Sequence, residues 1–350
     1  MKFNQITIKD IARELNISPS TVSRALKDHP DISVDTKKAV NALAEKLNYQ
    51  PNIVALNLRQ KKTNTIGVII PEVVHFFFST VISGIEDVAY QAGYNVILAQ
   101  SNESYTREVA HVKALFNSRV DGMLLSLSRE TTNFDHVESI ISKGVPIVFY
   151  DRMYNSPTSS KVIVDDYAGA KEATNHLISQ GCKNIVHLVG APNLIISIDR
   201  LRGYKDALKE NKMEVNEKLI LACNEGTFEE GKTVMEKFLK GSVKIDGLFA
   251  NNDPMAMGAM MAIKEKGLKI PEDIAVIGFS NWFIGEMMEP SLSTIDQPGF
   301  EMGQEAARLL IRQIELKVKD QYEAVEEIKI LKTRLIIRNS SLKKKQGKSK

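Results

Sequence analysis

Apolar residues near the start of the chain recur every three or four positions, which is the spacing of one helix face. This pattern covers residues 8–15, 18–26 and 33–47 and predicts three short helices without a strand. Ser18-Pro19 is a typical helix start, because a serine oxygen caps free backbone N–H groups and proline lacks the N–H at the first helical position. One more short, weakly apolar helical stretch is expected over residues 52–59.

From Thr65 the pattern changes, and short apolar runs alternate with longer amphipathic segments. The runs are TIGVIIP, YNVILAQS, VDGMLLS, PIVFYD, KVIVDD, NIVHLVG, LILACNEG, DGLFANND and IAVIGFSN. Helices are expected between them over residues 78–93, 111–117, 168–180, 201–210, 228–239, 255–266 and 300–316. Buried strands alternating with helices predict parallel sheets covered on both faces, and some ten strands favour two doubly wound lobes over one sheet.

Polar pairs follow three of the expected strands. They are Asp151-Arg152, Asn252-Asp253 and Ser280-Asn281. Ligands of doubly wound folds bind beyond the carboxyl ends of the strands, so these pairs indicate a ligand site.

The first two helices, joined by a tight turn at Asn16-Ile17, indicate a helix-turn-helix. The second helix would bury Val22 and Ala25 and present Ser20, Thr21 and Arg24. An arginine can bond guanine in the major groove, and hydroxyls at a helix N-terminus suit phosphates. On spacing alone, a helical bundle without a DNA role stays open.

The charges are unevenly distributed along the 350 residues. Residues 1–62 hold 11 Lys or Arg against 6 Asp or Glu, and residues 343–350 hold five Lys and no acid. The remainder holds 30 basic and 37 acidic residues. A basic head on an acidic body indicates a polyanion partner for the head, whereas the tail is most simply a disordered end.

Composition excludes several classes of protein. Two cysteines are too few for a disulfide framework, and no apolar run is long enough for a signal peptide or a membrane span, so a cytoplasmic protein without a membrane partner is expected. The six histidines are scattered, and neither a catalytic residue, a metal site nor a cofactor is predicted. GTFEEGKT at residues 226–233 satisfies the P-loop pattern, but two glutamates would repel a triphosphate, and Thr227 with Glu230 also forms a capping box.

The segment TIKDIARELNISPSTVSRALKDHPDISVDTKKAVNALAEKLNYQPNIVALNLR closely resembles the head of the lactose/galactose repressor (LacI) family of bacterial transcription factors. The resemblance continues through IGVIIP, DGMLLS, NNDPMAMGA, IAVIGF and LSTIDQP to about residue 340. It implies a helix-turn-helix domain over residues 1–50, a hinge helix and linker over 51–62, and an effector-binding and dimerisation domain over 63–342. That body resembles the periplasmic-binding-protein fold, and residues 343–350 remain a tail.

The resemblance also implies which residues meet DNA. Base readout would fall on Pro19, Ser20 and Arg24, and the other DNA-binding positions would be Thr7, Thr21, Ser23, Asn52, Ala55 and Leu58. Residues 52–59 resemble a hinge helix, in which Leu58 would be an apolar wedge in the minor groove and Ala55 would let two hinges approach. An ordinary apolar linker residue remains the alternative for Leu58.

For the body, the resemblance implies an effector between two lobes. The matching positions are Phe77, Phe78, Asp151, Arg152, Arg200, Phe228, Asn252, Asp253 and Ser280, and the nearby Trp282 could stack on a sugar or belong to the core. Carboxylate, amide, guanidinium and aromatic groups together suit a small sugar-like ligand. Many members carry Asp where this chain has Ser280, and apolar Leu194 and Ile196 argue against a purine.

The sequence therefore predicts a homodimeric, ligand-responsive transcriptional regulator, expected to be a repressor, that binds a palindromic operator in double-stranded DNA. The alternative is a cytoplasmic solute-binding protein without a specific DNA function. A nucleotide-hydrolysing switch, based on the P-loop pattern, ranks third.

Overall fold

The computed structural model describes residues 6–50, 62–154, 159–323 and 326–343. The chain divides into two compact units, a head (Met1–Thr63) and a body (Asn64–Lys350). Three residues predicted to form the hinge, Asn52, Ala55 and Leu58, lie outside the described residues. The tail is described only at Lys343, whose ammonium donates to the carbonyl of Asp246 at 2.9 Å.

The head contains α1 (Ile8–Glu14), α2 (Pro19–Ala25) and α3 (Val34–Lys46). The predicted cap is present, because Ser18 Oγ accepts from Thr21 N at 3.1 Å, and Ser33 Oγ caps α3 in the same way by accepting from Thr36 N at 3.3 Å. Asn16 turns the chain between α1 and α2 with a φ of 51°, a left-handed conformation that Asn tolerates better than most residues.

A small apolar core holds the three head helices together. Its buried members are Ile11, Ala12, Val22, Ala25, Val40 and Ala44. The core positions on α2 are those that the helical spacing predicts, so the opposite side of α2 is left to solvent.

The body contains two six-stranded sheets, each the centre of one lobe. In lobe 1 the strand order is β11 (Ile328–Leu331), β5 (Ser160–Val164), β4 (Ile147–Tyr150), β3 (Gly122–Leu125), β1 (Thr65–Ile70) and β2 (Asn95–Gln100). In lobe 2 it is β12 (Arg334–Ile336), β10 (Ser293–Asp296), β9 (Ala275–Phe279), β8 (Gly247–Ala250), β6 (Ile185–Val189) and β7 (Ile220–Ala222). Neighbouring strands are parallel except for β10 and β12.

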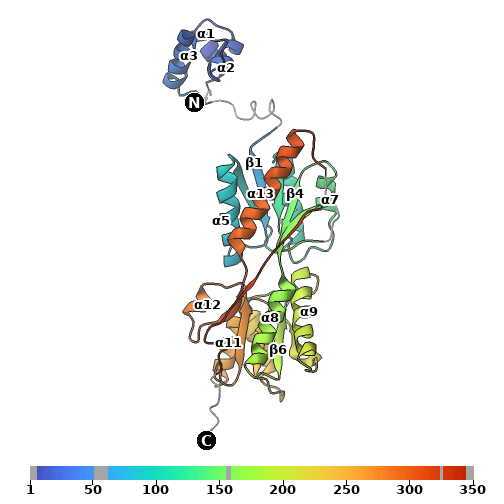
Figure 1. The fold of residues 1–350 in the computed structure, drawn as a ribbon. Coiled ribbons are helices and arrows are strands. Elements are labelled where there is room, and N and C mark those ends of the chain that lie inside the picture. The colour runs from blue at the N-terminus through green and yellow to red at the C-terminus, as the bar shows by residue number, and fades with distance from the viewer. Residues whose placement is uncertain (1–5, 51–61, 155–158, 324–325, 344–350) are drawn as a thin grey trace. The chain divides into compact units, whose positions relative to one another are not determined.

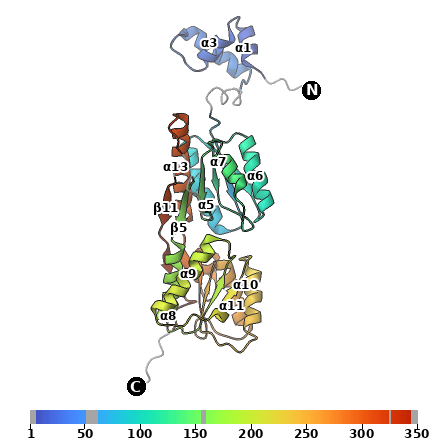
Figure 2. The same ribbon diagram turned by 90° about the vertical axis from the view of Figure 1, so that its right-hand side faces the viewer.

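Helices cover both faces of each sheet (Figures 1 and 2). In lobe 1, α5 (Phe76–Gln91) and α13 (Gly299–Val318) share one apolar cluster, and α6 (Tyr105–Asn117) and α7 (Asp135–Ile141) share another. In lobe 2, α8 (Asp166–Ser179) and α9 (Ile195–Glu210) lie on one face. The other face carries α10 (Phe228–Phe238) and α11 (Asp253–Glu265). The fold class predicted from the sequence, two doubly wound parallel-sheet lobes after a helical head, is confirmed.

The chain crosses between the lobes three times. It passes from β5 to α8, from β10 to α13 and from β11 to β12. Segments far apart in sequence therefore complete each lobe, and the carboxyl ends of most strands in both sheets point at the space between the lobes.

Helices α5 and α13 approach each other closely through two glycines. A Cβ on Gly84 would lie 2.0 Å from the carbonyl oxygen of Phe300, and one on Gly303 would lie 2.0 Å from that of Val81. A side chain at either position would force the two backbones apart.

Several elements differ from the sequence-based expectation. The short strands β10, β11 and β12, the helix α7 and the helix α12 (Ile284–Met287) were not expected, and α9 begins at Ile195 rather than Leu201. The edge strand β11 has exposed Ile328 and Ile330 alternating with lysine, so it lacks the continuous apolar run of a buried strand. Among the described residues, no helix is long and apolar enough to cross a bilayer.

Candidate DNA-binding and effector sites

Helix α2 presents a polar surface to solvent. Val22 and Ala25 are fully buried, whereas Pro19, Ser20 and Arg24 are exposed. The Ser18 hydroxyl lies 2.7 Å from the Ser20 hydroxyl and 2.8 Å from that of Thr21, so three hydroxyls gather at the start of the helix. The helix dipole and these hydroxyls make this end suited to a phosphate, with Arg24 one turn further along.

The other head positions predicted to meet DNA are arranged differently. Thr7 is exposed and begins α1, and its N–H and hydroxyl both donate to the Asp10 carboxylate, at 2.9 and 2.6 Å. Ser23 is half-buried on α2. The geometry of the head leaves Arg24 as the residue with the longest exposed polar side chain on α2.

In the body, a cavity of about 110 Å³ lies between the two lobes. Lobe 1 contributes the start of α5 and the segments that follow β2, β3 and β4, and lobe 2 contributes segments that follow β6, β7, β8, β9 and β10. The cavity therefore stands at the carboxyl ends of strands from both sheets, where the polar pairs of the sequence indicated a ligand site.

Most of the predicted effector residues line this cavity. They are Phe77, Phe78, Asp151, Arg152, Arg200, Asn252, Ser280 and Trp282, joined by Leu194 and Ile196. One wall is aromatic, because Phe77 and Phe78 meet edge to face with ring centroids 5.4 Å apart.

Phe228 and Asp253 lie outside the lining. Phe228 packs against the apolar core of lobe 2 under α10 and α11. Asp253 is fully buried, and its carboxylate accepts from the Thr294 hydroxyl at 2.7 Å and from Trp282 N at 2.6 Å. Asp253 therefore holds the loop that carries Trp282, which does line the cavity.

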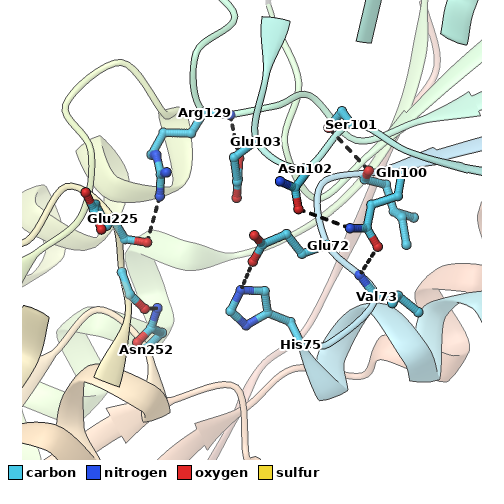
Figure 3. Close-up of polar contacts among 12 residues, drawn as sticks. Glu72, Val73, His75, Gln100, Ser101, Asn102, Glu103, Arg129, Glu225 and Asn252 are labelled. Atoms are coloured by element: carbon cyan, nitrogen blue, oxygen red, sulfur yellow. Dashed lines mark hydrogen bonds and ion pairs between the residues drawn. The ribbon is translucent and has the colours of Figure 1, made fainter. Parts of the chain in front are cut away.

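A network of charges in lobe 1 centres on Glu103, which the sequence analysis did not single out. Both of its carboxylate oxygens accept from Arg152 Nη1, at 2.8 and 2.9 Å, and one also accepts from Arg129 N at 2.7 Å. Burial alone would raise the pKa of Glu103, but Arg152, these hydrogen bonds and the charge of Arg129 hold it below its ordinary value. Figure 3 shows Glu103 beside Arg129.

Asp151 follows β4 with a φ of 59° and is buried. Its carboxylate lies 3.9 Å from Arg152 Nε, which is beyond hydrogen-bonding distance. Burial raises the pKa of Asp151, the guanidinium charges of Arg152 and Arg200 oppose this, and the charge of Glu103 adds to it.

In lobe 2, Arg200 on α9 is held by its neighbours. Its Nε and Nη2 lie 2.8 and 2.7 Å from one oxygen of Asp166, and Nη1 donates to the carbonyl of Asn251. The guanidinium carbon lies 3.7 Å from the centroid of the Phe279 ring. Burial raises the pKa of Asp166 to about 7, although Arg200 favours its charged form.

Ser280 has a φ of 111°, which is unusual for a residue with a side chain. Its hydroxyl donates to Oε1 of Gln297 at 2.8 Å, and Gln297 lies on the crossing from β10 to α13. Strained backbone of this kind is typical of functional sites.

The two lobes are bridged at the cavity by Arg129. Its Nη1 donates to the carbonyl of Glu225 in lobe 2 at 2.7 Å (Figure 3). Its own carbonyl accepts from Asn193 Nδ2 at 2.6 Å. Glu103 and Arg129 stand shortly after β2 and β3, so the strand-end rule applied to every strand would have found both.

The P-loop interpretation of residues 226–233 does not fit the geometry. The Glu230 carboxylate accepts from the backbone N–H groups of Glu225 and Gly226, at 2.8 and 2.9 Å. Thr227 caps α10 by accepting from Glu230 N at 3.1 Å. Backbone donors that a phosphate would need are thus already bonded to a carboxylate. The described residues also contain no cluster of metal-ligating side chains.

A helical DNA-binding head followed by a two-lobed body with a cavity between the lobes defines a ligand-responsive bacterial regulator. Residues 7–52 match the family model described as "Bacterial regulatory proteins, lacI family". Residues 63–339 match that of "Periplasmic binding proteins and sugar binding domain of LacI family". The chain belongs to the LacI family of transcriptional regulators, as the sequence resemblance predicted.

Known proteins are similar to this chain over nearly its whole length. The ribose operon repressor of Halalkalibacterium halodurans is 34% identical, covering 96% of this chain and 97% of its own. Catabolite control protein A of Priestia megaterium is 33% identical, covering 90% of this chain and 94% of its own. The crystal structure of the lac repressor dimer bound to operator and the anti-inducer ONPF has a TM-score of 0.83 at 25% identity. The match covers 97% of this chain and 100% of that one. These relatives are transcriptional regulators rather than enzymes.

Proposed function

We propose that this protein is a homodimeric repressor without catalytic activity, which binds a palindromic operator and responds to a small sugar-like effector in the interlobe cavity. The exposed polar side of α2 carries the proposal, because a basic head with Arg24 on that side is suited to reading the major groove. Thr7, Pro19, Ser20, Thr21 and Ser23 would complete the head surface that meets DNA.

The effector site is proposed from the cavity lining. Phe77, Phe78 and Trp282 offer aromatic faces, and Asp151, Asn252 and Ser280 offer polar groups. A LacI family regulator from Enterococcus faecium with bound ribose has a TM-score of 0.68 at 31% identity, covering 80% of this chain and all of that one. A pentose-like ligand is consistent with the same kind of cleft here.

The dimer is proposed from an apolar edge. β2 ends the lobe 1 sheet, and its Ile97 and Leu98 are 41% and 43% exposed. Val73, whose N–H donates to Gln100 at the end of β2, is 45% exposed. An uncovered apolar edge strand tends to pair with another chain. A second copy of this chain would cover the edge and bring two heads to two operator half-sites.

Effector binding would change the DNA affinity by altering the arrangement of the lobes. Because the chain crosses between lobes three times, any change in one crossing involves both sheets. The coupling free energy between the two sites then decides how far the effector changes operator affinity.

The experiment is enrichment of genomic DNA fragments by the purified full-length protein, with and without a mixture of sugars. We expect a palindromic sequence to be enriched and its recovery to change with sugar. The Arg24→Ala variant should lose the enrichment, whereas Arg202→Ala, which removes an exposed arginine from α9 in the body, should keep it. No enriched sequence in any condition would contradict the proposal and favour a solute-binding protein.

A further inference from the structure

We propose that the interlobe cavity selects an uncharged polyhydroxyl effector and rejects phosphorylated or carboxylated analogues, because its guanidinium groups are already held by groups of the protein. This inference rests on the proposed function and specifies the chemical class of its effector. The discriminating residue is Glu103, whose carboxylate pairs with Arg152 and adds a negative charge beside it.

The guanidinium bonding supports this directly. Arg152 lies in the cavity lining, but its Nη1 donates to both oxygens of Glu103. Capture of a phosphate or carboxylate by arginine works through a fork of free N–H groups. Nη1 is bonded to a buried carboxylate, so the charge of Arg152 is already balanced by an ion pair within the protein, and an anionic ligand that approached the remaining N–H groups would also approach Glu103.

Arg200 is occupied in the same way. Its Nε and Nη2 contact the carboxylate of Asp166, and its Nη1 donates to the carbonyl of Asn251. The guanidinium also lies over the Phe279 ring. The side chain is 4% exposed, so an incoming anion would have to displace a buried ion pair.

The third arginine of the lining is Arg129, at the bridge between the lobes. Its guanidinium Nη1 donates to the Glu225 carbonyl, and its backbone N–H donates to the Glu103 carboxylate. The Glu225 carboxylate belongs to the same lining. Counting Asp166 behind Arg200, four carboxyl groups stand beside three guanidinium groups, so the site offers no surplus positive charge.

The negative charges of the acidic residues in the site raise one another's pKa values. The charge of Glu103 contributes to the raised pKa of Asp151, and the charge of Asp151 contributes to that of Asp166, although burial is the larger cause for both. A ligand bearing another negative charge would increase this repulsion.

Unpartnered polar atoms indicate what the site accepts instead. Among the described residues, four in the cavity lining have buried atoms without a hydrogen-bond partner: Asn251 Oδ1, Ser197 Oγ, Arg152 Nε and Gln297 Nε2. The set mixes acceptors with donors, and the Asp151 carboxylate adds two more acceptors. Hydroxyl groups both donate and accept, so a neutral polyol can satisfy such a mixture, whereas an ammonium only donates.

The test is calorimetric titration of the full-length protein with matched panels. Each neutral sugar (D-ribose, D-glucose, D-fructose, cellobiose and their common isomers) is compared with its own phosphate, its aldonate and its amino analogue. We expect one or more neutral sugars to bind, and their anionic and amino counterparts to bind at least about tenfold more weakly.

The variant Glu103→Gln makes the test specific. It removes a negative charge and frees Arg152. The ratio of the dissociation constant of the phosphate analogue to that of the neutral sugar should therefore fall about fivefold or more. The matched control is Glu130→Gln, because Glu130 is exposed beside Arg129 in the loop after β3 and accepts from Tyr105 N rather than from a cavity residue. The control should keep the wild-type ratio.

Three results would overturn the inference. They are tighter binding of an anionic or amino analogue than of its neutral parent, a panel in which no neutral sugar binds, and an unchanged ratio in Glu103→Gln that still binds the neutral sugar. The proposed function fails separately, when no DNA sequence is enriched or when a bound sugar leaves the enrichment unchanged.

Discussion

The guanidinium of Arg129 in lobe 1 donates to the backbone carbonyl of Glu225 in lobe 2, across 2.7 Å. Asn193 of lobe 2 donates back to the Arg129 carbonyl at 2.6 Å. Arg129 also donates its N–H to Glu103, which holds Arg152 in the cavity lining. One loop therefore connects the effector cavity with the contact that bridges the lobes.

Replacing Asn193 by alanine tests this bridge, because Asn193 is exposed and lies outside the cavity lining. Loss of one hydrogen bond of about 0.5–1.5 kcal/mol should make the loop open more often, by a factor of about two to ten. Hydrogen exchange of peptides that cover residues 126–134, measured by mass spectrometry without effector, should rise accordingly.

The control for the bridge is Asn211→Ala. The Asn211 amide donates to Ala207 O and to Asn175 Oδ1, both within lobe 2, so exchange over residues 126–134 should stay at the wild-type rate. Equal exchange in wild type and Asn193→Ala would show that this contact does not restrain the loop.

The proposed dimer predicts an effect of charge on the edge strand β2. In Leu98→Lys, a lysine replaces a 43% exposed leucine at the proposed contact, and an ammonium buried there without a partner disfavours association. Sedimentation velocity should show a shift from dimer toward monomer, and operator affinity should fall with it.

A matched surface change is Val243→Lys, since Val243 is 41% exposed in lobe 2, away from β2. It should leave the dimer intact. If Leu98→Lys sediments like the wild type, the dimer does not use this edge.

Much of this architecture could be predicted from the chain because local signals and packing agree. The cap at Ser18 follows from the Ser18-Pro19 pair, and the buried Val22 and Ala25 follow from helical spacing. Strands buried on both faces, such as β4, read as unbroken apolar runs. The edge strand β11 does not, and its pairing with β5 is set by contacts across more than 150 positions of sequence.

The site was less predictable, because its residues depend on partners distant in sequence. Asp151 and Arg152 follow a strand that the pattern marks clearly, and the cavity contains both. Asp253 also follows a strand, yet its carboxylate is bonded to Thr294 and to the N–H of Trp282, away from the lining. Only the fold shows which strand-end side chains face the cavity and which hold a neighbouring loop.

The proposed role of Arg24 in base readout predicts that its replacement weakens DNA binding in a sequence-specific way. Arg24→Ala should cost about 1–3 kcal/mol with the enriched operator and relax discrimination at one base pair, since the variant would lose the proposed bidentate base contact. The measurement compares the affinity for the operator with that for its single-base variants at constant salt.

Lys27→Ala serves as the matched loss of one positive charge, because Lys27 is exposed just beyond the end of α2. Any effect of net charge alone should appear in both variants and for all sequences equally. Should Arg24→Ala weaken specific and nonspecific binding to the same extent, Arg24 contacts phosphate rather than a base.

The buried carboxyl of Asp253 predicts a pH dependence of stability. Burial raises its pKa from 3.8 to about 6, although the Thr294 hydroxyl and the Trp282 N–H favour the charged form. The folded state therefore binds this proton more tightly than the unfolded state. The resulting contribution to the free energy of unfolding is fully present below pH 3.8 and is lost as the pH rises through about 6.

Asp253→Asn removes this titration while keeping the shape of the side chain. The free energy of unfolding of the wild type relative to the variant should fall by about 2–3 kcal/mol between pH 4 and pH 7 and then level off. Urea unfolding at intervals of half a pH unit measures it. Thr294→Val, which removes a hydrogen bond to the carboxylate, should extend the fall to higher pH, because the charged form loses a donor. A difference between wild type and Asp253→Asn that does not vary with pH would mean that Asp253 keeps the same charge in both states, and its role in holding the Trp282 loop would then not depend on a proton.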